Sequence, residues 1–169
     1  MAAGGRPVIR AMAVTVSNRA AAGVYEDRSG PMLVTLLEDL DLQVDGPVVV
    51  PDGEPVAEVL ADAVAQGYDV VVTTGGTGLS PTDATPEMTR RIVEREIPGI
   101  AEAIRQEGRA EVPASILSRG VAGIAGRTLI VNLPGSTGGV RDGMAVLRTV
   151  LHHAVDQIGG GDHPRPPES

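Results

Sequence analysis

The residues best suited to chemistry lie in a glycine-rich segment near the middle of the chain, which runs from Val70 to Pro86. Three valines and two threonines open this segment, a composition typical of a buried strand, and Gly75, Gly76, Thr77 and Gly78 follow. Glycines allow positive φ angles and let a ligand approach backbone N–H groups that no Cβ shields. The loop could therefore hold a phosphate through its backbone donors.

An acidic residue and a helix start follow the loop. Asp83 precedes Thr85-Pro86-Glu87, in which a hydroxyl, a proline and an acid are typical of a helix N-terminus. We expect an anion site here, because the positive helix end and the loop N–H groups would face one point. A carboxylate beside a phosphate also suggests a bound cation.

A structural alternative remains open for this segment. The glycines could serve only a tight turn, with Asp83 as a solvated acid, although hydroxyls such as that of Ser80 among the glycines favour a ligand. The segment matches neither the Walker A motif nor the Gly-x-Gly-x-x-Gly dinucleotide fingerprint, so neither of those mechanisms transfers.

The composition favours a single α/β domain that does not bind nucleic acid. The chain has 169 residues, 42% of them hydrophobic, with 22 glycines, a net charge of −8 and 1% aromatic residues. It has no cysteine, and all 14 basic residues are arginine, which excludes thiol nucleophiles and lysine-based phosphate loops. The N-terminus has no apolar run of signal-peptide length, and no segment approaches the length of about 18 apolar residues that a membrane span needs, so we expect a cytoplasmic protein.

Strands and helices are expected to alternate, which indicates a three-layer α/β fold with a mostly parallel sheet and helices on both faces. The expected strands are 8–16, 43–50, 70–74 and 127–133, and the expected helices are 30–40, 54–66, 85–96, a short one ending at 106, and 140–158. Residues 121–126 suit a short buried segment or a subunit contact. The domain should span residues 7–158, with flexible ends at 1–6 and 159–169.

Ligands of such sheets bind beyond the carboxyl ends of the strands. Those ends carry Ser17, Asp52, the loop 75–83 and the segment 134–139, so loops distant in sequence should meet at one edge. This convergence indicates a phosphate-bearing ligand. Asp52 could instead be a turn acid, and Ser29 could be a helix cap or a second backbone-amide site.

Six motifs give the chain a family resemblance. In order they are Thr-Val-Ser-Asn-Arg (15–19), Tyr-Glu-Asp-Arg-Ser-Gly-Pro (25–31), Val-Pro-Asp (50–52), Thr-Gly-Gly-Thr-Gly-x-x-x-x-Asp-x-Thr-Pro-Glu (74–87), Ser-Arg-Gly-Val-Ala-Gly (118–123) and Asn-Leu-Pro-Gly-Ser (132–136). Together they resemble the MogA/MoaB family of molybdenum cofactor biosynthesis, to which the gephyrin G domain is similar. The resemblance covers residues 7–158.

The resemblance implies a trimeric domain that binds molybdopterin, a pterin dithiolene with a terminal phosphate. MogA-type members transfer AMP from Mg-ATP to that phosphate, release pyrophosphate and supply an activated intermediate for a metal-insertion enzyme. The two matching catalytic acids are Asp52 and Asp83, which we assign to Mg²⁺ coordination. The matching nucleotide and phosphate contacts are Gly75, Gly76, Thr77, Gly78, Ser80, Pro134, Gly135 and Ser136, with Ser17, Arg19, Ser29 and Arg119 as further contacts.

The chain departs from the family pattern at two places. Asn18 stands where many relatives have aspartate. Thr137-Gly138-Gly139 follows Pro-Gly-Ser where several relatives have a lysine, so a cationic contact to the triphosphate is either missing or supplied by Arg141. These departures leave open a MoaB-like alternative, a pterin-binding or assembly module without adenylyl transfer.

Overall fold

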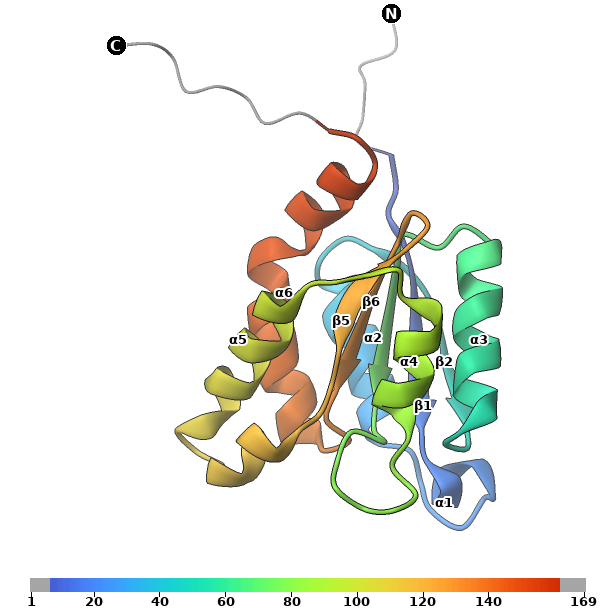
Figure 1. The fold of residues 1–169 in the computed structure, drawn as a ribbon, viewed down its shortest axis with the longest axis vertical. Helices are drawn as coiled ribbons and strands as arrows, with labels where there is room; N and C mark the ends of the chain where they lie inside the picture. The colour runs from blue at the N-terminus through green and yellow to red at the C-terminus, as the bar shows by residue number, and fades with distance from the viewer. Residues whose placement is uncertain (1–6, 162–169) are drawn as a thin grey trace, which may run out of the picture.

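A six-stranded sheet forms the centre of the structure, a computed structural model that describes residues 7–161 (Figure 1). The strands lie in the order β2-β1-β3-β6-β5-β4. Neighbours among β1, β2, β3 and β6 are parallel, whereas β5 pairs antiparallel with both β4 and β6. The bounds are β1 Arg10–Val16, β2 Gln43–Val50, β3 Val70–Thr74, β4 Arg95–Glu96, β5 Ala122–Ala125 and β6 Thr128–Leu133. The predicted three-layer, mostly parallel architecture is confirmed.

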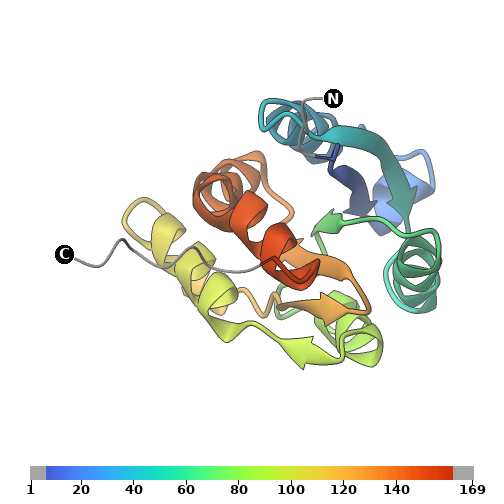
Figure 2. The ribbon, with the colours of Figure 1, turned by 90° about the horizontal axis from the view of Figure 1, so that it is seen from above.

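Helices cover both faces of the sheet, with α2, α5 and α6 on one face and α3 and α4 on the other (Figure 2). Their bounds are α1 Asn18–Ala21, α2 Ser29–Glu38, α3 Glu54–Ala65, α4 Thr85–Ile92, α5 Pro98–Arg109, the 3₁₀ helix η1 Pro113–Leu117 and α6 Thr137–Ile158. Within residues 7–161, no helix is both long and apolar enough to cross a membrane.

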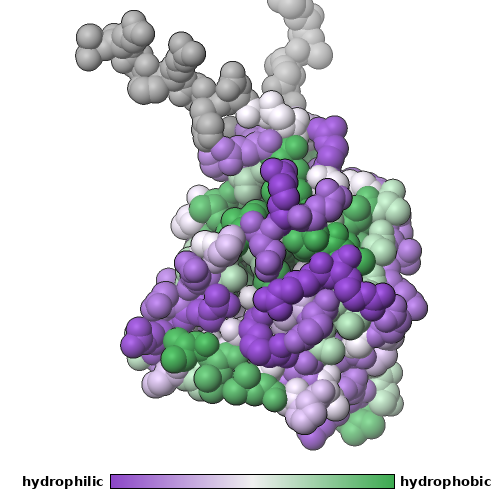
Figure 3. Space-filling model, viewed as in Figure 1, coloured by the Kyte–Doolittle hydropathy of each residue, from purple (hydrophilic) through white to green (hydrophobic). Residues whose placement is uncertain are grey.

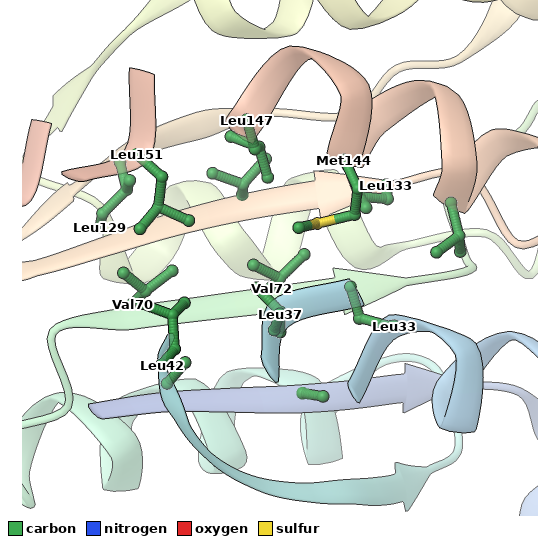
Figure 4. Packing of buried hydrophobic residues seen from close by; sticks show 14 of the residues in the cluster. Leu33, Leu37, Leu42, Val70, Val72, Leu129, Leu133, Met144, Leu147 and Leu151 are labelled. Atoms are coloured by element: carbon green, nitrogen blue, oxygen red, sulfur yellow. The ribbon is translucent and has the colours of Figure 1, made fainter. Parts of the chain in front are cut away.

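Successive side chains of β3 point to opposite faces of the sheet, and each face has its own aliphatic core. Val70 and Val72 pack with leucines of α2 and α6 such as Leu33 and Leu147 (Figure 4), whereas Val71 points to the other face, toward α3. All three valines are 0% exposed. Burial of each large aliphatic side chain stabilises the fold by about 1.5–3 kcal/mol. This burial on both faces explains why three valines follow one another in β3 instead of alternating with exposed polar residues.

The edge of the sheet beyond β6 differs from the prediction. The helix expected to reach residue 96 ends at Ile92, residues 95–96 form β4, and residues 122–125 of the small apolar segment form β5. Gly123 permits this edge, because a Cβ there would collide with Val93 and lie 2.7 Å from the carbonyl oxygen of Arg95. The close approach of β4 to β5 therefore depends on a residue without a side chain.

Smaller differences occur at helix ends. The helix α1 was not expected, and α6 begins at Thr137 instead of residue 140, capped by the Ser136 hydroxyl, which accepts from the Gly139 N–H at 2.9 Å. Residues 159–161 form a hydrogen-bonded turn after α6. The remaining residues of the predicted flexible ends, 1–6 and 162–169, lie outside the described residues.

Candidate active site

The two glycine loops that follow β3 and β6 touch one another. The Gly75 N–H donates to the carbonyl of Leu133 at 3.0 Å, and a Cβ built on Gly135 would lie 3.2 Å from the Gly75 Cα. Parallel pairing of β3 with β6 brings both loops to the same sheet edge. The predicted convergence of these loops is therefore present in the structure.

A third strand end, that of β2, joins the same site through Asp52. Gly76 has a φ of +70°, and a Cβ there would collide with the Asp52 carboxylate and the Thr85 hydroxyl. A glycine is thus needed at position 76 for two reasons, backbone conformation and space. Because Gly76 has no side chain, the end of β2 can lie against the loop that follows β3.

Asp52 holds the residues that begin α4, although it lies far from that helix in sequence. One carboxylate oxygen accepts from the Gly53 N–H at 2.7 Å and from the Thr85 hydroxyl at 3.1 Å, and the other accepts from the Ala84 N–H at 3.0 Å. Thr85, which we expected to cap the helix, is its first residue and donates to Asp52 instead. The Asp52 N–H in turn donates to the Asn18 side-chain oxygen at 2.9 Å.

Asp83 has a freer carboxylate than Asp52. Its Oδ2 accepts from the Ser80 N–H at 3.1 Å, whereas its Oδ1 has no hydrogen-bond partner within residues 7–161. This oxygen is therefore available to a ligand or a cation.

Two pockets meet at these loops, and Gly76, Asp83, Gly135 and Ser136 line both of them. The first has a volume of about 570 Å³, and its wall contains Ser17, Ser29 and Asp52. The second has a volume of about 450 Å³; its lining includes Thr77, Gly78, Pro134, Ser118, Asp142, Val112 and Leu117. Ser80 lies on the loop but lines neither pocket, so it contributes through its backbone N–H to Asp83.

The second pocket opens beside an apolar surface. Val112, Ile116 and Leu117 are each at least half exposed around η1, and Figure 3 shows an apolar band over this part of the chain. An apolar wall with a few polar groups suits a flat heterocyclic ligand.

The first pocket contains two arginines, Arg19 and Arg28, whose side chains make no ion pair or hydrogen bond to the part of the chain that the structure describes. Arg141, one of the two alternatives for the missing lysine, lines a separate hollow of about 170 Å³ between α2 and α6. Arg141 therefore does not supply a cation to this site.

Asp27 is a site residue that we did not single out from the sequence. It lines the first pocket, accepts from the Thr15 hydroxyl at 2.8 Å and accepts from the Gly30 N–H at 2.9 Å. Asp27 thus takes the capping role that we considered for Ser29, which is the first residue of α2. Both Asp27 and Arg28 lie in the 25–31 motif, so the motif was the available signal.

Arg119 lies behind the glycine loop and lines neither pocket. Its guanidinium donates to two loop carbonyls and pairs with Glu87, whose pKa it lowers through this hydrogen bond. We had predicted that Arg119 contacts a ligand. In the structure its guanidinium contacts the glycine loop instead.

Comparison with known proteins identifies the family. A family model described as a probable molybdopterin binding domain matches residues 12–153. The chain belongs to this family. A solved structure of MogA is 58% identical to this molybdopterin-binding domain, with a TM-score of 0.87 over 88% of this chain and 99% of the other. MoaB from Thermus thermophilus is 41% identical, with a TM-score of 0.84 over 90% and 98%.

Curated relatives differ in length from this molybdopterin-binding domain. A molybdopterin adenylyltransferase of Helicobacter pylori is 35% identical over 154 residues, covering 87% of this chain and 86% of the relative. A bifunctional molybdenum cofactor biosynthesis protein of Synechococcus elongatus is 39% identical over 155 residues. The chain spans about half of that protein, 48% of its length.

The residues of this molybdopterin-binding domain fit a magnesium ion that arrives with a nucleotide. Among residues 7–161, no group of three acidic, histidine or cysteine side chains could hold a metal alone. Mg²⁺ commonly binds through one or two carboxylates together with substrate phosphates. Asp83, with a free oxygen, and Asp52, with one oxygen that accepts a single hydrogen bond, would serve as those carboxylates.

Proposed function

We propose that this domain is a molybdopterin adenylyltransferase, which transfers AMP from Mg-ATP to the terminal phosphate of molybdopterin and releases pyrophosphate. The observation that carries this proposal is the pair of adjoining pockets that share Asp83 and the Gly135-Ser136 loop. A transfer between two substrates needs both reacting groups at one place. The adenylyltransferase relative and the higher identity to MogA than to MoaB support the same conclusion.

Charge and polarity favour different substrates for the two pockets. Arg19 and Arg28 suit the triphosphate in the first pocket, because arginine forms strong charge-assisted hydrogen bonds with phosphate. Val112 and Leu117 suit the pterin in the second. The pterin phosphate and the α-phosphate would then meet at the shared wall beside Asp83.

The chemical step needs no general base, because the molybdopterin phosphate is already anionic. One of its oxygens attacks the α-phosphorus of ATP, a new P–O bond forms, and the bond to the β-phosphate oxygen breaks in line as pyrophosphate leaves. Mg²⁺, when bound with the nucleotide, neutralises part of the triphosphate charge. Asp83 and Asp52 would hold that ion, and the backbone N–H groups of Gly76, Thr77 and Gly78 would donate to the phosphates.

Labelled ATP tests the reaction class. With anaerobic molybdopterin and Mg-ATP, label from the α-phosphate should appear on molybdopterin and label from the γ-phosphate should appear in pyrophosphate. Transfer of the γ-label to molybdopterin would show phosphoryl transfer instead. Bound molybdopterin with no transfer of either label would favour the MoaB-like pterin-binding module.

The arginines of the first pocket give a separate prediction. Arg19→Gln and Arg28→Gln should each raise the KM for ATP roughly 10- to 100-fold, since each removes a charge-assisted contact of about 1.5–3 kcal/mol. The KM for molybdopterin should change little. Arg141→Gln is the matched control, because Arg141 lies in the separate hollow. An unchanged KM for ATP in both variants would show that the triphosphate does not bind in this pocket.

The resemblance to MogA and MoaB also supports three further parts of this proposal. They are a homotrimeric assembly, a cytoplasmic location and delivery of the adenylated product to a molybdenum-insertion enzyme. Sedimentation equilibrium of the purified protein would test the trimer directly.

A further inference from the structure

One arginine holds both ends of the loop that carries Asp83. The Arg119 Nε donates to the carbonyl of Gly78 at 2.9 Å, and its Nη2 donates to the carbonyl of Asp83 at 2.8 Å. The Arg119 N–H donates to the carbonyl of Thr77 at 2.8 Å. The segment 78–83 is thus fixed to the chain just before β5 at its first and last residues.

The third arm of the same guanidinium ties the loop to a helix. Nη1 pairs with the Glu87 carboxylate in the first turn of α4, the helix that begins directly after the loop. A planar guanidinium can make these three contacts at once, whereas the single ammonium of lysine cannot match the fork. The loop and the helix start are therefore held in one arrangement.

Hydrogen bonds inside the loop connect the Asp83 carboxylate to the residues that Arg119 holds. The Ser80 N–H donates to the Asp83 Oδ2 at 3.1 Å, and the Asp83 N–H donates to the Ser80 carbonyl at 2.9 Å. A Cβ built on Gly78 would lie 2.8 Å from the Asp83 Oδ2, so the carboxylate lies against the residue that Arg119 holds. A shift of either loop end would move the carboxylate.

We propose that Arg119 is a positioning residue, which places the Asp83 carboxylate at the junction of the two pockets. This role rests on the adenylyltransferase function proposed above. Arg119 lines neither pocket but instead a hollow of about 390 Å³ on the side of α5 and β5, together with Arg90 and Arg105. It therefore acts on the reaction through the loop and not through contact with either substrate.

The test is Arg119→Lys, which keeps the positive charge but removes the planar guanidinium that makes three contacts at once. The kcat of adenylyl transfer should fall roughly 10- to 100-fold, as expected for a displacement of a reacting-site group by about 1 Å. The KM for molybdopterin should stay within about two-fold, because Arg119 lines neither pocket. The Mg²⁺ concentration for half-maximal rate should rise, since the displaced Asp83 carboxylate holds the ion less well.

Arg91→Lys is the matched control. Arg91 lies on the same helix as Glu87 and makes a two-pronged ion pair with Glu54 of α3 at 2.7 and 3.1 Å, away from the loop. Its kcat and Mg²⁺ requirement should equal those of the wild type. Hydrogen exchange of the amides of 76–84 should increase in Arg119→Lys only.

The outcomes separate this role from the function on which it rests. An inactive wild-type protein would overturn the adenylyltransferase proposal and this role with it. An active wild type with unchanged kcat and Mg²⁺ requirement in Arg119→Lys would overturn the positioning role alone. A loss of kcat that matched only the fraction of unfolded variant, measured by circular dichroism, would also overturn it.

Discussion

Replacement of Asp83 by asparagine should lower the rate of adenylyl transfer by roughly 10³-fold, a loss typical for removal of one preorganised electrostatic group. The amide can still accept from the Ser80 N–H, which donates to the Asp83 Oδ2 at 3.1 Å. The charge is lost, and an amide NH₂ group takes the place of Oδ1, so the side chain that lines both pockets no longer attracts a cation. Single-turnover rates with saturating molybdopterin and Mg-ATP would measure the loss.

The structure also predicts that this variant folds normally. Asp83 is half-buried and its carboxylate accepts one backbone hydrogen bond, so the free energy of unfolding should change by less than about 1 kcal/mol. Asp62→Asn is a suitable control, because Asp62 is an exposed acid on α3 that lines neither pocket. A folded Asp83→Asn protein with the wild-type rate would exclude Asp83 from the reaction.

Asp52→Ala should lose stability as well as activity. The substitution removes three hydrogen bonds, from the Gly53 N–H, the Ala84 N–H and the Thr85 hydroxyl, and Thr85 is 0% exposed. Two lost hydrogen bonds to backbone N–H groups together with a buried hydroxyl without a partner should cost about 2–3 kcal/mol. Urea unfolding would show this as a lower midpoint with an unchanged m value.

A second variant separates the two roles of Asp52. Asn at this position keeps an acceptor oxygen for some of these hydrogen bonds, so Asp52→Asn should lose only about 1 kcal/mol of stability while still losing most activity. Equal stability of Asp52→Ala and the wild type would show that the hydrogen bonds of Asp52 do not stabilise the start of α4.

Much of this architecture could be predicted from local patterns. The apolar run 70–74 and the glycines after it indicate a buried strand and a loop, and the rule for parallel sheets places Asp52 and Asp83 at one edge. That rule needs only the order of strands and helices, not their contacts. It succeeded because β1, β2, β3 and β6 each carry a strong strand pattern.

The sequence could not predict features that depend on packing between distant segments. The strand β4 has two residues, and β5 is the segment Ala-Gly-Ile-Ala, so neither carries a local strand signal. The side of the loop on which Arg119 lies depends on where β5 is placed, and a motif cannot show this. Ser29 was a plausible cap for α2 from the sequence, and only the position of the Gly30 N–H shows that Asp27 takes that role.

The most direct test of adenylyl transfer is pyrophosphate release from purified protein, with Asp83→Asn as the control. Release should require both molybdopterin and Mg-ATP, occur once per molybdopterin adenylated and disappear in the variant. Release from Mg-ATP alone, or none at all while molybdopterin remains bound, would contradict adenylyl transfer at the junction of the two pockets.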